Sequence, residues 1–397
     1  MICIRRVYLD HAATTPVRPE VADIMVRYMV EKFGNPSSIH SFGREARQAV
    51  DDARDKIAEF IGAEPREIIF TSGGTEADNL ALKGVLEANP SKGRHIITSQ
   101  IEHHAILHTC EYLEKRGYSV TYLPVDSYGM VSPEDVASAF RNDTAVVSIM
   151  MANNEVGTIQ PVEKIGRICR EKGVPFHTDS VQALGQIPVN VGKLGIDMMS
   201  VSSHKIYGPK GIGVLYLRRG IRVTPLAHGG VHERGLRAGT ENIPGIVGFG
   251  KACELAMAEF DQRVTHYEAV RDRLMDGILT TIPHSRLNGH RTVRLPNNCN
   301  VSILYVEGES MLLNLDMNGI AASSGSACTS GSLEPSHVLM AMGVKHEEAQ
   351  GSLRFTVGTG TTIDDIDYVL SVLPRIVERL RAMSPLTGQP WGEGDGV

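Results

Sequence analysis

The feature that most constrains the fold is an alternation of short β-rich runs with amphipathic helical patterns between about residues 66 and 217. For example, "EIIFTS" precedes "TEADNLALKGVLEA", and "HIITS" precedes "AILHTCEYLEKRG". Later β-rich runs in the same region are "SVTYLPV", "TAVVSIMMA", "PFHTDS", "DMMSVS" and "GVLYL". Such alternation is typical of a mostly parallel sheet wrapped by helices. The sequence therefore predicts an α/β fold.

The pattern changes in the second half of the chain. A helical stretch over residues 246–281 is followed by the β-rich runs "NNCNVSILYV", "GIAASSG" and "GSLRFTVG" and by a helical pattern over 364–381. We expect a large domain over residues 16–260 and a smaller α+β domain formed by residues 1–15 and 261–383. The tail, 384–397, is rich in Gly and Pro, which favours disorder.

Composition and charge exclude several classes of protein. The 397 residues carry a formal net charge of −6, which gives no footprint for nucleic acid or an anionic membrane. No apolar run approaches the roughly 18 residues that span a bilayer, and the first residues do not resemble a secretory signal. The six cysteines contain no C-x-x-C pair, which fits a reducing compartment. We therefore expect a cytoplasmic protein.

Polar groups follow several of the β-rich runs, where open α/β sheets bind ligands. The segment "TSGGTEADN" places Gly73, Gly74 and Thr75 between a predicted strand and a predicted helix. Backbone N–H groups and a hydroxyl there could hold a phosphate. A Gly-rich turn with Thr75 as the helix N-cap is the equally weighted alternative.

Two further runs end in charged residues. Asp179, in "HTDSVQALG", is either a helix N-cap or a carboxylate that keeps a proton on a heterocyclic nitrogen. In "SVSSHKIYGPKGIG", Lys205 stands between a buried-looking run and a rigid Gly/Pro turn. Desolvation there would lower the pKa of the amine and favour imine chemistry, although a lone lysine is normally a solvated surface charge.

Three histidines in "IEHHAILH", namely His103, His104 and His108, invite a metal interpretation. No Cys, Asp or Glu pattern accompanies them, so one histidine facing a cofactor is the simpler interpretation. A lysine, an acid, phosphate donors and a flat ring together meet the needs of pyridoxal phosphate.

The sequence is similar to a known family at eight motifs. They are "YLDHAATTP", "FGNPSSIHSFG", "SGGTEADN", "ANNEVGTIQP", "HTDSVQALG", "SSHKIYGPKG", "RAGTEN" and "SGSACTSGSLEPSHVL". These motifs resemble the cysteine desulfurases of the NifS/IscS type, in the class V aminotransferase superfamily. The resemblance implies a fold-type I homodimer with a mostly parallel seven-stranded sheet and bound pyridoxal 5'-phosphate. It also implies that sulfur from L-cysteine serves iron–sulfur cluster assembly, with L-alanine released.

The same resemblance assigns roles to individual residues. Lys205 corresponds to the Schiff-base lysine, Asp179 to the partner of the ring nitrogen, and His103 to the histidine that stacks on the ring and handles protons. Arg354 corresponds to the clamp on the substrate carboxylate, and Cys328 to the nucleophile that accepts sulfur. The remaining assignments are ring or substrate contacts for Asn154 and Gln182, phosphate contacts for Gly74, Thr75, Ser202 and His204, and a phosphate contact supplied to the partner subunit for Thr240.

Cys328 lies among small residues in "SSGSACTSG", which suits a thiol that must reach the substrate and then carry sulfur to an acceptor. An IscU-type scaffold is the acceptor that the family implies, and the Gly-rich tail does not support its docking. The sequence leaves open whether tRNA thiolation is also served. It also leaves open a transient role of Cys328 as an iron–sulfur ligand.

Other functions remain as alternatives. A selenocysteine lyase or an aminotransferase would share the cofactor residues, and a transaminase would not need Cys328. A non-catalytic sulfur carrier would bind no pyridoxal phosphate, so the purified protein would be colourless. The segment "GIVGFGKA" is one residue short of a nucleotide-binding P-loop, because Ala252 replaces the hydroxyl residue. Pro244 before it indicates a helix start instead.

Overall fold

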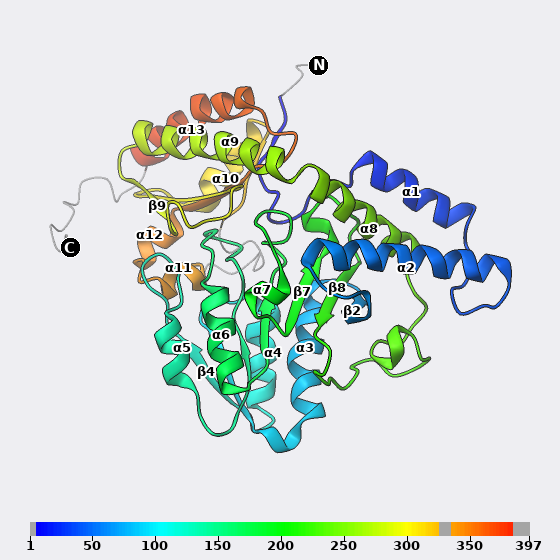
Figure 1. Ribbon diagram of the computed structural model, residues 1–397. Coiled ribbons are helices and arrows are strands. Elements are labelled where there is room, and N and C mark those ends of the chain that lie inside the picture. Colours follow the sequence, from blue (N-terminus) through cyan, green and yellow to red (C-terminus); the bar gives the residue numbers. More distant parts are fainter. Residues whose placement is uncertain (1–4, 325–334, 384–397) are drawn as a thin grey trace.

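A computed structural model describes residues 5–324 and 335–383, which form a large lobe around one sheet and a smaller lobe beside it (Figure 1). The large sheet has seven strands in the order β2-β8-β7-β6-β5-β3-β4. Their bounds are β2 (Ile68–Thr71), β3 (His95–Ser99), β4 (Ser119–Leu123), β5 (Thr144–Ser148), β6 (Phe176–Asp179), β7 (Met198–Ser202) and β8 (Gly213–Leu217).

The direction of these strands confirms the predicted sheet. The pairs β4–β3, β3–β5, β5–β6 and β6–β7 are parallel, whereas β8 is antiparallel to both β7 and β2. All of the sheet except β8 therefore runs in one direction. The carboxyl ends of β2, β3, β5, β6 and β7 meet at the same edge of the sheet.

Helices cover both faces because neighbouring strand residues alternate between two cores. Ile68 and Phe70 pack with α2, α6 and α8, whereas Ile69 packs with α3 and α4 on the other face. The helices of the large lobe are α1 (Pro19–Val30), α2 (Ser41–Ile61), α3 (Gly74–Ala88), α4 (His104–Glu114), α5 (Pro133–Ala139), α6 (Val162–Lys172), α7 (Val191–Leu194) and α8 (Ile243–Ala258). Short 3₁₀ turns lie at Pro65–Glu67, Pro90–Lys92, Ser203–Lys205 and Glu233–Gly235.

Local signals in the sequence are also found in the structure. The Ser132 side chain caps α5, with Pro133 in the first turn, as the sequence indicates. The segment "GIVGFGKA" lies inside α8, which begins at Ile243 with Pro244 in its first turn. The P-loop alternative is therefore wrong, because that motif needs a strand and a loop before the helix.

The smaller lobe has an antiparallel sheet with the order β12-β10-β9, covered by α9, α10 and α13. Val7 and Leu9 join its core, and β1 pairs in parallel with β11, so this part of the N-terminal segment packs on the smaller lobe. The bounds are β1 (Val7–Tyr8), α9 (Phe260–Thr281), β9 (Ser285–Asn288), β10 (Asn298–Ile303), α10 (Gly308–Met317), β11 (Ile320–Ala321), α11 (His337–Ala341), α12 (His346–Gln350), β12 (Ser352–Thr356) and α13 (Ile363–Met383).

Side-chain contacts join the two lobes along their interface, which we call the seam. The Tyr207 hydroxyl on the large lobe contacts the Tyr267 hydroxyl at 3.1 Å and accepts a hydrogen bond from the Thr359 N–H. Val338 and Leu339 of α11 form a small core with Ile101 and Met150, which follow β3 and β5. The domain boundaries given above stay a prediction. The tail, 384–397, lies outside the described residues.

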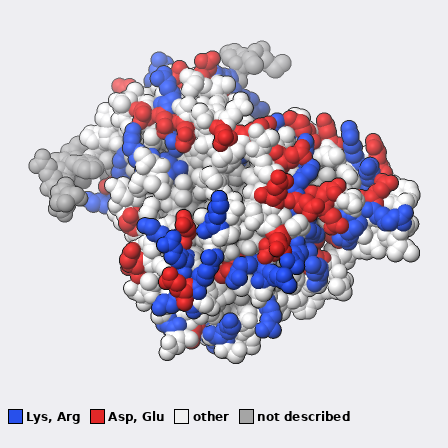
Figure 2. Space-filling view, in the orientation of Figure 1, with Lys and Arg blue, Asp and Glu red and all other residues white. Residues whose placement is uncertain are grey.

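The surface carries both signs of charge. Figure 2 shows Lys and Arg side chains next to Asp and Glu side chains across one face of the molecule. Among the described residues, no helix combines the length and the apolar character that crossing a bilayer requires.

One buried ion pair yields a test of the large lobe. The Arg54 guanidinium binds the Glu233 carboxylate through two hydrogen bonds of 2.9 and 2.7 Å, and both side chains are buried. We expect Glu233→Gln to lower the free energy of unfolding by about 3–5 kcal/mol, because the Arg54 charge would stay buried without its partner. Denaturant unfolding measures this loss.

The control for this experiment is Glu163→Gln, which removes the exposed Glu163–Arg167 pair on α6. Its expected cost is below about 1 kcal/mol. Equal effects of the two substitutions would contradict the stabilising role of the buried pair.

Candidate active site

The predicted site residues come from the strand ends that meet at one edge of the large sheet. Asp179 is the last residue of β6, and Ser202 is the last residue of β7. The residues that follow these or neighbouring strands are Gly74 and Thr75 after β2, His103 after β3, Asn154 after β5, Gln182 after β6, and His204 and Lys205 after β7.

Lys205 lies against the N-terminal segment. Its Nζ donates to the backbone oxygen of Ala12 and, at 2.8 Å, to that of Ala13. The Gln182 amide nitrogen donates to the same Ala12 oxygen at 2.9 Å. Thr14 then contacts the His204 ring through its hydroxyl at 3.2 Å. The segment 12–14 therefore brings Lys205, Gln182 and His204 together.

Asp179 is buried, and no helix begins there. Its Oδ1 accepts a hydrogen bond from the Val181 N–H at 2.9 Å, which forms a local turn, and the next described helix begins at Val191. The helix N-cap alternative is therefore wrong. Burial raises the pKa of Asp179, while the charges of His103 and Lys205 act in the opposite direction. Burial is the larger of these effects, so the pKa of Asp179 is raised overall.

Neutral groups surround Asp179 below the surface. Burial raises the pKa of Glu102 to about 8, although the Ser99 hydroxyl and the Met150 N–H donate to its carboxyl. Burial also lowers the pKa of His177 to about 3, so its ring is neutral at physiological pH. A protonated Glu102 and a neutral His177 add no charge that competes with Asp179.

The first turn of α3 forms a cradle suited to a phosphate group. A Cβ added to Gly74 would come within 2.7 Å of the Val181 side chain, so a glycine lets the helix lie close to the Asp179 turn. A Cβ on Gly73 would meet nothing within 4 Å, which leaves room in front of the helix N-terminus. The helix begins at Gly74, with Gly73 as its N-cap. The alternative with Thr75 as the N-cap is therefore wrong.

The three histidines of the α4 region have different surroundings. His103 is the N-cap of α4, and its Nδ1 accepts from the Ala105 N–H at 3.1 Å. His104 stacks on His108, with ring centroids 5.0 Å apart. Within 5–324 and 335–383, no group of three or more His, Cys, Asp or Glu side chains could hold a metal ion.

Arg354 reaches this region from β12 of the smaller lobe. The side chain is buried; it donates to the Asn154 backbone oxygen at 3.0 Å and to the Asp10 carboxylate at 3.1 Å. In the described part of the chain, the buried Nε of Arg354 has no hydrogen-bond partner. A guanidinium held in this way at the seam can bind a carboxylate ligand.

Two predicted site residues are not placed with the others. Thr240 is exposed, which is compatible with a contact to a second subunit. Its predicted contact with the partner's phosphate stays a prediction. Cys328 lies outside the described residues, so its role as nucleophile or iron–sulfur ligand stays a prediction.

The residues present fit pyridoxal phosphate. A buried carboxylate beside cationic neighbours suits the ring nitrogen, Lys205 supplies an amine, and the space before α3 suits a phosphate. The cofactor fits because the ends of neighbouring strands bring the carboxyl, the amine and the phosphate site to one edge of the sheet.

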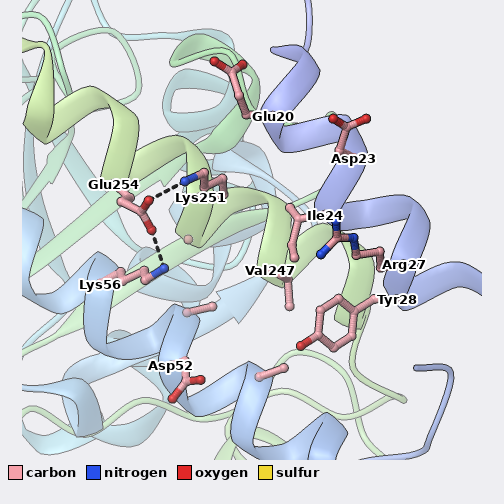
Figure 3. A pocket seen from close by; sticks show the side chains of 13 residues that line it. Glu20, Asp23, Ile24, Arg27, Tyr28, Asp52, Lys56, Val247, Lys251 and Glu254 are labelled. Carbon is pink, nitrogen blue, oxygen red and sulfur yellow. Dashed lines mark hydrogen bonds and ion pairs between the residues drawn. The ribbon is translucent and has the colours of Figure 1, made fainter. Parts of the chain in front are cut away.

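A separate cavity of about 460 Å³ lies between α1, α2 and α8 (Figure 3). Its lining mixes acidic and basic side chains, and Glu254 there binds both Lys56 and Lys251. Of the predicted site residues that the structure describes, none lines this cavity.

Sequence reasoning missed several residues of the site. Asp10 pairs with Arg354, and Glu102 lies buried beside the Asp179 region. Both stand inside motifs quoted above, "YLDHAATTP" and "IEHHAILH". In each motif the carboxylate directly precedes a histidine, which could have marked it as a candidate site residue. Residue spacing could not show that the Glu102 carboxyl is buried.

Comparisons with known proteins agree with this geometry. The family model described as Aminotransferase class-V matches residues 7–369. A protein from Methanosarcina thermophila named cysteine desulfurase IscS is 58% identical over 96% of this chain and 95% of its own length. A protein of the same name from Dictyoglomus turgidum is 56% identical over 98% of each chain. A solved structure titled NifS-like protein has a TM-score of 0.89 and 42% identity, covering 95% of this chain and all of that chain.

The raised pKa of Glu102 gives a test of the neutral surroundings of Asp179. A carboxyl whose pKa is about 8 in the folded state and near 4.5 when unfolded stabilises the fold below pH 4.5. That contribution is lost as the pH rises through 8. Glu102→Gln mimics the protonated acid at every pH. Relative to this variant, the wild type should lose more than about 2 kcal/mol of unfolding free energy between pH 5 and pH 9.

Denaturant unfolding across this pH range measures the difference between the two proteins. Stability curves that run parallel from pH 5 to pH 9 would mean that Glu102 is not protonated in the folded protein.

Proposed function

Since the chain belongs to the class-V aminotransferase family and is a pyridoxal phosphate-dependent cysteine desulfurase, we propose that it converts L-cysteine to L-alanine and loads the released sulfur on Cys328. The observation that carries this proposal is that Lys205 and Arg354 bind neighbouring residues of the N-terminal segment: Lys205 donates to the Ala13 carbonyl and Arg354 to the Asp10 carboxylate. One supplies an amine for an aldehyde, and the other supplies a clamp for an amino-acid carboxylate.

Bound pyridoxal phosphate supplies an electron sink for the bonds at the substrate α-carbon. Lys205 holds the aldehyde in the resting enzyme and moves the α-proton during turnover. Asp179 keeps the proton on the ring nitrogen, and its burial beside His103 and Lys205 supports this role. The other residues that hold the cofactor are His103, Asn154 and Gln182 at the ring and Gly74, Thr75, Ser202 and His204 at the phosphate.

Arg354 orients the substrate by its carboxylate. Its guanidinium already has two fixed hydrogen-bond partners, Asp10 and the Asn154 backbone, so it is preorganised before the substrate binds. Asn154 lies at the same point, where it can contact the substrate and the cofactor.

Cys328 then removes the sulfur. Its thiolate attacks the substrate sulfur, and an S–S bond forms as the Cβ–S bond breaks. The electron pair of the broken bond stays with the carbon skeleton, which His103 protonates to give L-alanine. The free thiol has a pKa of ~8.5, so the site must favour the thiolate.

Sulfur on Cys328 then passes to acceptors. Relatives named IscS support a place in sulfur supply, and we propose iron–sulfur cluster assembly with an IscU-type scaffold as the main route. Transfer to tRNA thiolation and a transient iron–sulfur bond to Cys328 are further parts of the proposal. The enzyme acts in the cytoplasm as a homodimer, in which Thr240 contacts the phosphate bound by the partner subunit.

Replacing the nucleophile separates sulfur transfer from cofactor binding. We expect Cys328→Ala to keep the affinity for pyridoxal phosphate within about twofold and to lower the formation of alanine and sulfide from L-cysteine at least 100-fold. Visible absorption measures the bound cofactor, and product assays measure turnover.

The control is Cys110→Ala, which changes a buried cysteine of α4 that the mechanism does not use. This variant should retain turnover. Wild-type rates in Cys328→Ala would remove the proposed nucleophile.

A further inference from the structure

The mechanism leaves the buried carboxyl of Glu155 without a role. Glu155 follows Asn154 in the turn after β5 and is 4% exposed. Its Oε2 accepts a hydrogen bond from the Ser336 hydroxyl. Ser336 is the N-cap of α11, where its Oγ also accepts from the Leu339 N–H at 3.2 Å. The carboxyl therefore fixes the residue at which α11 begins.

The backbone around Glu155 is held on both sides. Its N–H donates to the Asn153 side chain at 2.9 Å, and its carbonyl oxygen accepts from the side chains of Asn298 and Asn300 on β10 at 3.0 and 3.1 Å. β10 pairs with β12, which carries Arg354. The turn is thus anchored to the sheet of the smaller lobe, and the direction of the carboxyl is set by a rigid backbone.

The substrate clamp belongs to the same network. Arg354 donates to the carbonyl oxygen of Asn154, the residue before Glu155. The backbone of Arg354 also pairs with Ser323 through hydrogen bonds of 3.1 and 2.6 Å. In the sequence, Ser323 and Ser336 stand five residues before and eight residues after Cys328. Both chain ends that flank the cysteine are therefore bound to the elements that hold the clamp.

We propose that Glu155 is a positioning residue for sulfur transfer: it fixes Ser336, which follows Cys328 by eight residues in the sequence, to the turn that holds Arg354. This role rests on the proposed function of Cys328. Glu155 acts through Ser336 and does not itself bind the substrate. Its loss should slow the attack of Cys328 while the amino-acid carboxylate still binds at Arg354.

The charges around Glu155 agree with this role. Burial raises its pKa to about 7, and the positive groups that face it, Arg354 from β12 and His103 from the start of α4, act in the opposite direction. The neighbouring carboxylate of Asp10 pairs with Arg354. A carboxyl of this kind keeps an oxygen that accepts from Ser336 in either protonation state, so the tether persists across neutral pH.

The experiment compares Glu155→Gln, Glu155→Ala and Ser336→Ala as holoenzymes. Two quantities are measured: the affinity for L-alanine from the change in the visible spectrum, and the single-turnover rate of persulfide formation on Cys328 by mass spectrometry. L-Alanine presents the carboxylate without the sulfur, so it reports the clamp alone.

Ser336→Ala and Glu155→Ala should lower the persulfide rate about tenfold or more, with the affinity for L-alanine changed less than about twofold. Glu155→Gln keeps a carbonyl oxygen that accepts from Ser336, so it should lose less than Glu155→Ala. Ser336→Ala keeps the proposal testable if the Glu155 variants fail to fold.

The matched control is Ser132→Ala, which removes the same kind of N-cap from α5, where Ser132 accepts from Glu134 and Asp135. It should leave both measurements unchanged. A wild-type persulfide rate in Ser336→Ala, or equal losses of persulfide rate and L-alanine affinity, would overturn the proposal. A wild-type enzyme that forms no persulfide on Cys328 would instead refute the proposed function.

Discussion

The parallel direction of β2, β3, β5, β6 and β7 is the constraint on which the site depends. Strands that run the same way end at the same edge, so loops from distant parts of the sequence deliver their side chains to one place. A buried carboxyl at the end of β6 and an amine after β7 come close there, and the charge of Lys205 opposes the rise that burial causes in the pKa of Asp179. The reversed strand β8 lies between β2 and β7 and begins at this edge, so the loop that carries His204 and Lys205 leads from the end of β7 into β8.

The N-terminal segment links this edge to the smaller lobe. Its backbone oxygens accept from Lys205 and Gln182, its Asp10 carboxylate binds Arg354, and its strand β1 pairs in the smaller lobe. Residues 10–13 thus contact the predicted cofactor site and the predicted substrate clamp. The relative placement of amine and guanidinium depends on this segment as much as on the sheet.

Much of the fold could be predicted from the sequence, because hydrophobic alternation and turn residues act locally. Examples are the parallel strands, the cap at Ser132 and the start of α8 at Pro244. The alternation of Ile68, Ile69 and Phe70 between two cores explains why such short runs become strands covered on both faces.

The site was less predictable, because its partners are far apart in the sequence. Asp10 and Arg354 are 344 residues apart, and only the pairing of the smaller lobe with the N-terminal segment joins them. The burial of Glu102 and Glu155 depends on packing against elements from elsewhere in the chain, so spacing could not reveal their shifted pKa values. The roles of Thr240 and Cys328 came from family resemblance alone.

The central claim, that Lys205 is the amine that holds the cofactor at this edge, is tested most directly by chemical trapping. The purified protein, supplied with pyridoxal phosphate, is reduced with borohydride, digested and mapped by mass spectrometry. The account predicts a phosphopyridoxyl group on the peptide that contains Lys205. A label on another lysine, such as the exposed Lys210 in the same turn, or no label at all, would contradict it.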